Sequence, residues 1–229
     1  MEHILFLDIE TVSSAKTYEQ LDARMQQLWS KKVEKLKHAE EQMPAEFYKN
    51  AGIYAEFGKI ICISVAYMKN NELRIKSFHG ENEKILLEDF ADLLGKYFSK
   101  NHHRLCAHNG KEFDFPYLCR RMLVNGVTIP EILNVSGKKP WETRFLDTME
   151  LWRFGDYKHY TSLDLLAAIF NIPSPKEDTD GSMVHELYWQ LKDYQCIKKY
   201  CEKDVLTVVQ LFLRYQGKEL LQDNQIVFL

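Results

Sequence analysis

The sequence has few of the features that mark secreted, fibrous or membrane-spanning chains. Its 229 residues include only 10 glycines, 6 prolines and 5 cysteines, which excludes a collagen-like chain or an array of flexible linkers. The cysteines are scattered and form no C-x-x-C pair, so neither a disulfide framework nor a structural zinc site is indicated. No apolar run approaches the roughly 20 residues that cross a bilayer. We therefore expect a cytoplasmic protein with reduced thiols.

An excess of positive charge is also missing. The chain has 30 lysines and arginines against 33 aspartates and glutamates, a formal net charge of -3. Proteins that coat a nucleic-acid duplex usually carry a strongly basic surface, so any nucleic-acid partner must be bound at a small local site. The hydrophobic content of 45% and charged content of 28% are those of an ordinary globular protein. The length predicts one domain over residues 1–229.

Hydrophobic periodicity predicts an α/β fold with a mixed sheet flanked by helices. Strands are predicted at 4–9, 59–68, 72–78, 104–108 and 145–151. Helices are predicted at 83–98, 114–124, 162–170 and 195–215. The second and third strands are separated by Asn70-Asn71, a turn-forming pair, and read as an antiparallel hairpin.

A polar segment of about residues 13–57 separates the first strand from this hairpin. Its helical spacing over 17–41 predicts a helical insertion after the first strand, because a structureless loop of this length is uncommon. The charged run at 31–41 is typical of a solvated helix face. The alternative is a lid, or a helix that contacts a nucleic-acid strand.

Two acids, Asp8 and Glu10, end the first predicted strand. Side chains at i and i+2 of a strand project from the same face, so these carboxylates share one location. Ionised side by side they repel unless a proton or a cation lies between them, and oxygen ligands suit Mg²⁺ or Mn²⁺. The alternative is a strand end with two solvated acids.

A third acid, Asp114, follows the strand at 104–108 and begins a predicted helix. Ligands gather at the ends of strands in α/β sheets. Aspartate at a helix start is also a common N-cap. Asn109 supplies an amide nearby, and Phe113 offers an aromatic face on which a base can stack.

The fourth acid, Asp204, stands one helical turn after Tyr200 in the last predicted helix, so the phenol and the carboxylate share one face. A pair of this kind is common in helices, where the tyrosine usually packs. With Asp8, Glu10 and Asp114 it completes a set of four acids and a tyrosine.

These motifs resemble the three motifs of the DEDD superfamily of 3'-5' exonucleases. They are FLDIET at 6–11, N-x-x-x-F-D at 109–114 and Y-x-x-x-D at 200–204. Tyr200, where other members have histidine, is similar to the DEDDy branch, which includes the proofreading domains of family B DNA polymerases. The segments YCEKDVLTVVQLFLRY and SPKEDTDGSMV resemble stand-alone predicted exonucleases related to those domains.

The resemblance implies a ribonuclease-H-like fold in which four acids hold two divalent metal ions, Mg²⁺ or Mn²⁺. The implied metal ligands are Asp8, Glu10, Asp114 and Asp204. It implies that Tyr200 orients the attacking water. The implied contacts to the terminal nucleotide are Ile9, Thr11, Asn109 and Phe113. Asp147 matches a frequent Asp-Thr of such nucleases, and we interpret it as a structural or supporting acid because the set of four is already complete.

The resulting expectation is a metal-dependent 3'-5' exonuclease that acts on single-stranded 3' ends, DNA more than RNA. The alternatives are an exoribonuclease that trims RNA ends and a catalytically silent nucleic-acid-binding module of the same fold. A protein-interaction domain that uses the insertion is a further alternative. Lys176, Asp178 and Gly181 belong to a polar loop that either contacts the scissile strand or is plain surface.

Overall fold

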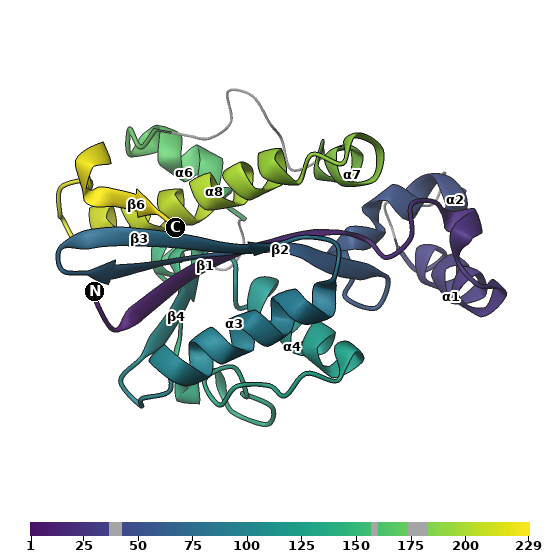
Figure 1. Cartoon of the computed structure of the whole chain (residues 1–229), viewed down its shortest axis with the longest axis horizontal. Helices are drawn as coiled ribbons and strands as arrows, with labels where there is room; N and C mark the ends of the chain where they lie inside the picture. The colour runs from purple at the N-terminus through teal and green to yellow at the C-terminus, as the bar shows by residue number, and fades with distance from the viewer. Residues whose placement is uncertain (37–42, 157–159, 174–182) are drawn as a thin grey trace.

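A computed structural model describes residues 1–36, 43–156, 160–173 and 183–229, so His159 and the loop containing Lys176, Asp178 and Gly181 lie outside the described residues. The described chain forms one six-stranded sheet with helices on both faces (Figure 1). The strands are β1 (Ile4–Ser13), β2 (Gly58–Lys69), β3 (Glu72–His79), β4 (Arg104–Ala107), β5 (Phe145–Asp147) and β6 (Ile226–Phe228). The α-helices are α1 (Ala23–Val33), α2 (Pro44–Phe47), α3 (Glu83–Tyr97), α4 (Asp114–Asn125), α5 (Thr148–Arg153), α6 (Leu163–Ile169), α7 (Val184–Glu186) and α8 (Tyr194–Tyr215).

Short helical turns complete the described elements. They are the 3-10 helices η1 (Tyr18–Gln20), η2 (Tyr48–Ile53), η3 (Pro140–Glu142) and η6 (Asp223–Gln225), and the π-helix η5 (Leu187–Leu191).

The sheet is mixed, as predicted, with strand order β5-β4-β1-β2-β3-β6. β1 pairs antiparallel with β2 and parallel with β4. β3 pairs antiparallel with β2, while β4 and β5 are parallel. The hairpin turn uses Asn70 and Asn71 with φ of 52° and 65°, the left-handed backbone that a two-residue hairpin turn requires and that asparagine tolerates well. The predicted hairpin is confirmed.

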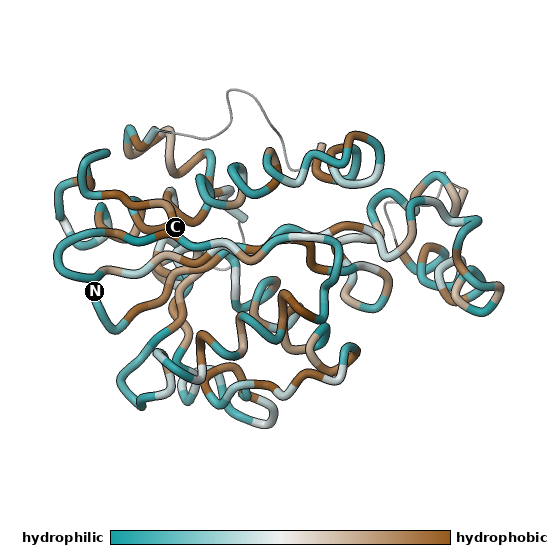
Figure 2. Tube along the Cα trace, in the orientation of Figure 1, coloured by the Kyte–Doolittle hydropathy of each residue, from teal (hydrophilic) through white to brown (hydrophobic). Residues whose placement is uncertain are grey.

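The alternation along β1 decides which side chains meet which helices. Leu5 and Leu7 belong to the buried cluster on the face that α3 and α4 cover. Ile4 and Phe6 belong to the cluster on the opposite face, which α8 covers. Figure 2 shows the hydrophobic residues concentrated along the central strands. Because the period is two, the next even positions, Asp8 and Glu10, continue the face toward α8.

One predicted strand was wrong in its extent, and one strand was missed. The run at 145–151 is a strand only to Asp147, because that carboxylate accepts hydrogen bonds from the backbone amides of Met149 at 2.9 Å and Glu150 at 3.4 Å. This N-cap starts α5 and overrides the apolar run. Strand β6 was not predicted; its three residues pair parallel with β3, as Leu73 opposite Ile226 shows, and are too few to give a periodic signal.

The segment between β1 and β2 carries α1, α2, η1 and η2 and projects from the sheet (Figure 1). We call residues 14–57 the arm; 14–36 and 43–57 of it are described. The arm has a cluster of its own around Trp29, which is fully buried against Tyr48 and Phe57. The Trp29 Nε1 donates to the Pro44 carbonyl at 2.8 Å. The predicted helical insertion is therefore a folded unit with its own core.

None of the described helices combines the length and the apolar character that crossing a membrane requires. All five cysteines are free thiols, as predicted.

Candidate active site

The site begins at the end of β1, where Asp8 and Glu10 face α8. Asp8 lies opposite Ser64 of β2, and Glu10 lies opposite Cys62. The ladder is irregular directly after Glu10, between Glu10 and Thr11; a bulge at such a position turns the strand and re-aims the side chains that follow. Ligand atoms of Asp8, Glu10 and Cys201 lie within 4.8 Å of one another. The structure therefore brings the two predicted acids together.

Asp114 reaches the same place from the start of α4. Its side chain is 4% exposed, and it accepts a hydrogen bond from the backbone amide of Ile9 in β1. β1 extends beyond its pairing with β4, which involves only residues 4–6 of β1. This leaves the Ile9 amide without a strand partner on the side of β4. The hydrogen bond thus ties the first residue of α4 to the strand that carries the other acids.

Tyr200 and Asp204 arrive from α8, which packs across β1, β2 and β3. The two side chains are joined by a hydrogen bond, as one-turn spacing on a helix allows. Burial raises the pKa of Tyr200, and the charges of Asp204, Glu10 and Asp8 raise it further. The phenol therefore remains protonated and can donate its hydrogen.

The charges of the four acids act on one another. Burial raises the pKa of Asp8 well above its ordinary value, and the charges of Asp204, Glu10 and Asp114 add to the effect. Burial likewise raises the pKa of Glu10, followed by the charge of Asp204. The pKa of Asp114 rises to about 7, chiefly through burial. The acids predicted from three separate motifs therefore form one cluster, hereafter the acid cluster.

Asp147 is not part of the acid cluster but supports it. Its carboxylate accepts hydrogen bonds from the backbone amides of Asn109 at 2.9 Å and Lys111 at 3.0 Å, in addition to those at the start of α5. These bonds fix the loop that leads into Asp114 and support the interpretation of Asp147 as a structural acid. Its charge also raises the pKa of Asp114.

Two thiols, Cys62 and Cys201, lie beside the acids, and no pattern in the sequence indicates their contacts. The Cys201 Sγ is 3.4 Å from Asp8 Oδ2 and 3.5 Å from the Asp8 carbonyl oxygen. Burial and the neighbouring Cys62 thiol raise the pKa of Cys201. Cys201 is therefore a neutral thiol that donates to Asp8. The contact depends on how α8 crosses β1, which residue spacing does not report.

A cavity of about 650 Å³ adjoins the acid cluster. Its described lining residues are Ile9, Glu10, Thr11, Val12, Lys49, Asn50, Gly52, Ile53, Phe113, His185, Glu186 and Gln190. Three of the four predicted nucleotide contacts are among them. Asn109 is not among them: its backbone is left-handed, with φ of 58°, and its Oδ1 is buried without a hydrogen-bond partner among the described residues.

The cavity also contains residues that were not predicted, from the arm and from the region of α7 and η5. His185 lies 3.3 Å from Ser13 Oγ through Nδ1. No local pattern identifies such residues, because only the tertiary fold brings them beside β1. His108, by contrast, is held through Nδ1 by Thr148 Oγ1 and through Nε2 by the Thr161 carbonyl, both at 2.9 Å, and so has a structural role.

The chemistry of the acid cluster fits divalent cations. Four carboxylates supply hard oxygen donors of the kind that Mg²⁺ and Mn²⁺ prefer. Their mutual repulsion raises the pKa values of Asp8 and Glu10, and a bound cation would reverse that effect.

Comparison with known families gives one match. A family model described as a predicted 3'-5' exonuclease related to the exonuclease domain of PolB matches residues 53–224. This stretch contains Asp114, Tyr200 and Asp204, while Asp8 and Glu10 precede it. No curated protein matches the chain.

Among solved structures, the family B DNA polymerase from the hyperthermophilic archaeon Pyrobaculum calidifontis is similar to this chain. The sequence identity is 16% and the TM-score is 0.54, with 92% of this chain and 24% of that chain covered. This chain thus spans about a quarter of that polymerase. At this identity the likeness concerns the fold, and it agrees with the predicted ribonuclease-H-like α/β architecture.

Proposed function

The chain belongs to the family of predicted 3'-5' exonucleases related to the exonuclease domain of PolB, and from this premise we propose that it hydrolyses single-stranded nucleic acid from the 3' end. DNA is the favoured substrate. The reaction requires two divalent ions, Mg²⁺ or Mn²⁺, and the protein acts as a DEDDy-type nuclease.

The observation that carries the proposal is the convergence of five side chains from distant parts of the sequence. Asp8 and Glu10 come from β1, Asp114 from α4, and Tyr200 and Asp204 from α8. A cluster of buried acids that raise one another's pKa lowers the stability of the fold, so its presence indicates a function that uses the acids. Binding of cations and a phosphodiester would be such a function.

The four carboxylates of the acid cluster would hold the ions. When bound, a pair of divalent ions stabilises the attacking and leaving oxygens of a displacement at phosphorus and lowers the pKa of water. The carboxylates alone would repel a phosphodiester. Substrate binding and hydrolysis are therefore both expected to depend on metal.

Tyr200 would orient the attacking water. Its protonated hydroxyl bonds to Asp204, and its oxygen retains a lone pair that can accept a hydrogen bond from water. Ile9, Thr11 and Phe113 line the adjoining cavity and would hold the terminal nucleotide, with the Phe113 ring available for stacking. Asn109, whose buried Oδ1 has no hydrogen-bond partner among the described residues, would contact the same nucleotide.

The test uses purified protein with single-stranded DNA and RNA, each labelled at the 3' or the 5' end, in Mg²⁺, Mn²⁺ or EDTA. We expect stepwise shortening from the 3' end that EDTA abolishes, faster on DNA. Faster shortening of RNA would identify an exoribonuclease. Metal-independent binding without cleavage would identify a silent binding module, and internal cuts or release from the 5' end would refute the proposal.

A further inference from the structure

The arm forms part of the cavity beside the acid cluster. Lys49 and Asn50 of η2 line that cavity together with Glu10, Thr11 and Phe113. Residues 49 and 50 precede the stretch 53–224 that the family model matches. The arm therefore adds side chains to the site that the family match does not describe.

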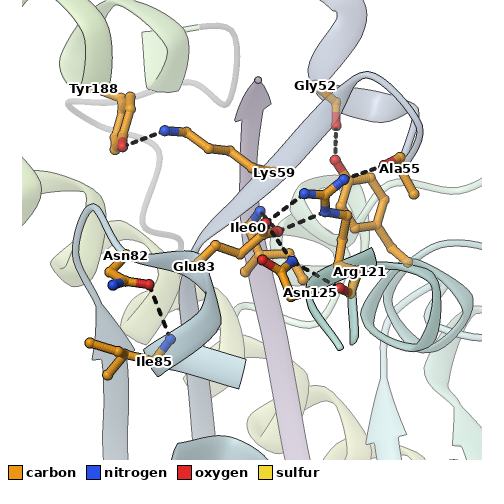
Figure 3. Close-up of polar contacts among 11 residues, drawn as sticks. Gly52, Ala55, Lys59, Ile60, Asn82, Glu83, Ile85, Arg121, Asn125 and Tyr188 are labelled. Carbon is orange, nitrogen blue, oxygen red and sulfur yellow. Dashed lines mark hydrogen bonds and ion pairs between the residues drawn. The ribbon is translucent and has the colours of Figure 1, made fainter. Parts of the chain in front are cut away.

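The base of the arm is fixed to the body of the protein by a buried polar network (Figure 3). The Tyr117 hydroxyl donates to the Gly52 carbonyl at 2.7 Å, and Arg121 Nη1 donates to the Ala55 carbonyl at 2.9 Å. Arg121 is held in turn by Glu83 through two hydrogen bonds, at 2.8 Å and 2.6 Å. Two side chains of α4 thus hold the backbone of the arm, one at Gly52 within η2 and one at Ala55 just after it.

Glycine allows this close approach. A Cβ on Gly52 would lie 3.0 Å from the backbone of Val12 in β1, a contact that real Cβ atoms rarely make. A Cβ on Gly58 would lie 2.2 Å from the Tyr117 hydroxyl. η2 is therefore set against the end of β1 and held there, and Lys49 and Asn50 have a defined position relative to Glu10.

The opposite boundary of the cavity, from α7 and η5, is fixed as well. His185 bonds Ser13, and Lys59 Nζ donates to the Tyr188 hydroxyl at 2.8 Å. Burial lowers the pKa of His185, so this imidazole is neutral near pH 7 and adds no positive charge. Lys49 is the only lysine or arginine among the described lining residues. It is exposed and forms no ion pair with any other described residue.

A nucleic-acid strand that enters this cavity needs a positively charged side chain to bind its phosphates. A single strand entering the site carries a phosphate on each nucleotide, whereas the chain has a net charge of -3 and a cavity bordered by Glu10 and Glu186. Phosphate contacts by lysine supply much of the affinity for nucleic acid. The cavity volume of about 650 Å³ is in the range of a small-ligand pocket. This volume suits the end of one strand.

We propose that η2, at the base of the arm, is a strand clamp, in which Lys49 binds a backbone phosphate near the 3' end of the strand and Asn50 hydrogen-bonds the same strand. The proposal rests on the proposed function, because it takes the cavity beside the acid cluster as the place of the 3' end. It assigns the arm a part in selecting single-stranded ends.

The experiment measures binding of a 5'-fluorescein-labelled single-stranded oligonucleotide by fluorescence anisotropy, with Ca²⁺ in place of Mg²⁺ and the oligonucleotide checked for cleavage. The variants are Lys49→Ala and Lys49→Glu. Matched controls are Lys31→Ala and Lys31→Glu, which change the same charge on the exposed surface of α1 away from the described lining. Each variant is titrated at salt concentrations from about 50 to 200 mM, the range over which phosphate contacts dominate the change.

We expect Lys49→Ala to raise Kd about fivefold and to reduce the slope of log Kd against log salt by about 0.7, the value for one phosphate of a single strand. Lys49→Glu raises Kd more than about tenfold, since it adds repulsion. The Lys31 variants leave both quantities unchanged. A blunt duplex binds weakly to every variant.

Equal behaviour of the Lys49 and Lys31 variants overturns the clamp. The clamp and the proposed function fail separately. If the wild type cleaves 3' ends and Lys49 has no effect on binding, only the clamp is wrong. If the wild type never cleaves but Lys49 still governs binding, the clamp holds and the nuclease proposal is wrong.

Discussion

Two sites with buried carboxylates, Glu83 and the acid cluster, have different surroundings. Glu83 on α3 is 7% exposed and accepts hydrogen bonds from the Ile60 amide at 2.7 Å, from Arg121 at 2.8 and 2.6 Å, and from Asn125 at 2.9 Å. Its charge is balanced by the guanidinium, and both oxygens are bonded. This carboxylate holds the arm and α4 in place.

Asp8 of the acid cluster has different neighbours among the described residues. The hydrogen bonds to Asp8 come from the Cys201 thiol, and the charges that act on Asp8 are those of Asp204, Glu10 and Asp114. A neutral thiol does not balance a negative charge. Glu83 is therefore paired with a cation within the protein, whereas the described neighbours of Asp8 are a neutral thiol and further acids.

The difference separates a structural use of buried acids from a ligand-binding use. A paired carboxylate costs stability when its partner is removed, because an uncompensated charge remains. A cluster of like charges gains stability when one of its members is removed or a cation is added. The following substitutions and conditions test this distinction.

The largest effect is expected from removing one acid of the cluster. Asp8→Ala or Asp204→Ala removes one of the proposed metal ligands, and we expect the rate of hydrolysis to fall more than about a thousandfold, a loss of several kcal/mol of transition-state stabilisation. The fold remains intact by circular dichroism, and the metal-free variant melts at a higher temperature than the metal-free wild type. Asp89→Ala, at an exposed position of α3, serves as control. Wild-type turnover by either variant would contradict the assignment.

Breaking the ion pair of Glu83 with Arg121 is expected to lower the stability of the protein and to leave the metal dependence of hydrolysis unchanged. Glu83→Ala leaves Arg121 buried without its partner and should lower the free energy of unfolding by about 3–5 kcal/mol, measured by urea denaturation. The dependence of hydrolysis on metal concentration stays as in the wild type. The control is Glu88→Ala, which removes the exposed ion pair of Lys84 with Glu88 and should cost less than about 1 kcal/mol. Equal losses for Glu83→Ala and Glu88→Ala would refute the comparison.

The acid cluster should also give the metal-free protein a characteristic pH dependence. The pKa of Asp114 rises from its ordinary 3.8 to about 7 in the folded state. Between these values the folded protein holds a proton that the unfolded chain has released, so stability is lost as pH rises from about 4 to about 7. The total is on the order of 4 kcal/mol, at 1.36 kcal/mol for each pH unit.

The measurement is urea unfolding in EDTA, comparing the wild type with Asp114→Asn at each pH. The difference removes the contribution of titrating groups that do not interact with Asp114, such as His108, whose pKa is lowered by burial. Added Mg²⁺ should reverse most of the loss at pH 7. A wild type that tracks Asp114→Asn across this range would show that Asp114 does not titrate there.

The smallest effect on the rate of hydrolysis is expected from removing the neutral hydroxyl of Tyr200. Tyr200→Phe removes one hydroxyl that bonds Asp204, and we expect single-turnover hydrolysis to slow by about 10- to 100-fold, as the loss of one oriented hydrogen bond implies. Affinity for Mg²⁺ and thermal stability change little. Tyr194→Phe, which removes the hydroxyl that contacts Glu81 from the first residue of the same helix, provides the control. An unchanged rate in Tyr200→Phe would show that the phenol has no part in the reaction.

The elements that position the acids could be predicted from the sequence because their signals are local. Alternation along 4–9 placed Asp8 and Glu10 on one face, and one-turn spacing placed Tyr200 beside Asp204. The resemblance to known nuclease motifs joined these pairs with Asp114, and the structure brings them together. Asn70-Asn71 likewise predicted the hairpin, since its turn is set by two residues.

The parts that could not be predicted depend on contacts between distant segments. β6 exists because it pairs with β3, and the thiol of Cys201 meets Asp8 only through the crossing of α8 over β1. Lys49 and His185 line the same cavity although they are far apart in the sequence. At 145–151 a local signal was present but misread, because the capping carboxylate of Asp147 decides the outcome.

The crossing of α8 over the sheet also sets the order in which the molecule becomes competent during synthesis. Asp8, Glu10 and Asp114 emerge first, and they lack two partners until α8, about 80 residues later, has docked on the even face of β1. Domains generally fold as units once their chain is available. The proposed hydrolysis of nucleic acid would then be a property that a nascent chain acquires late, when the sheet and its last long helix have come together. An unfinished chain beside ribosomal RNA would carry only part of the proposed metal site.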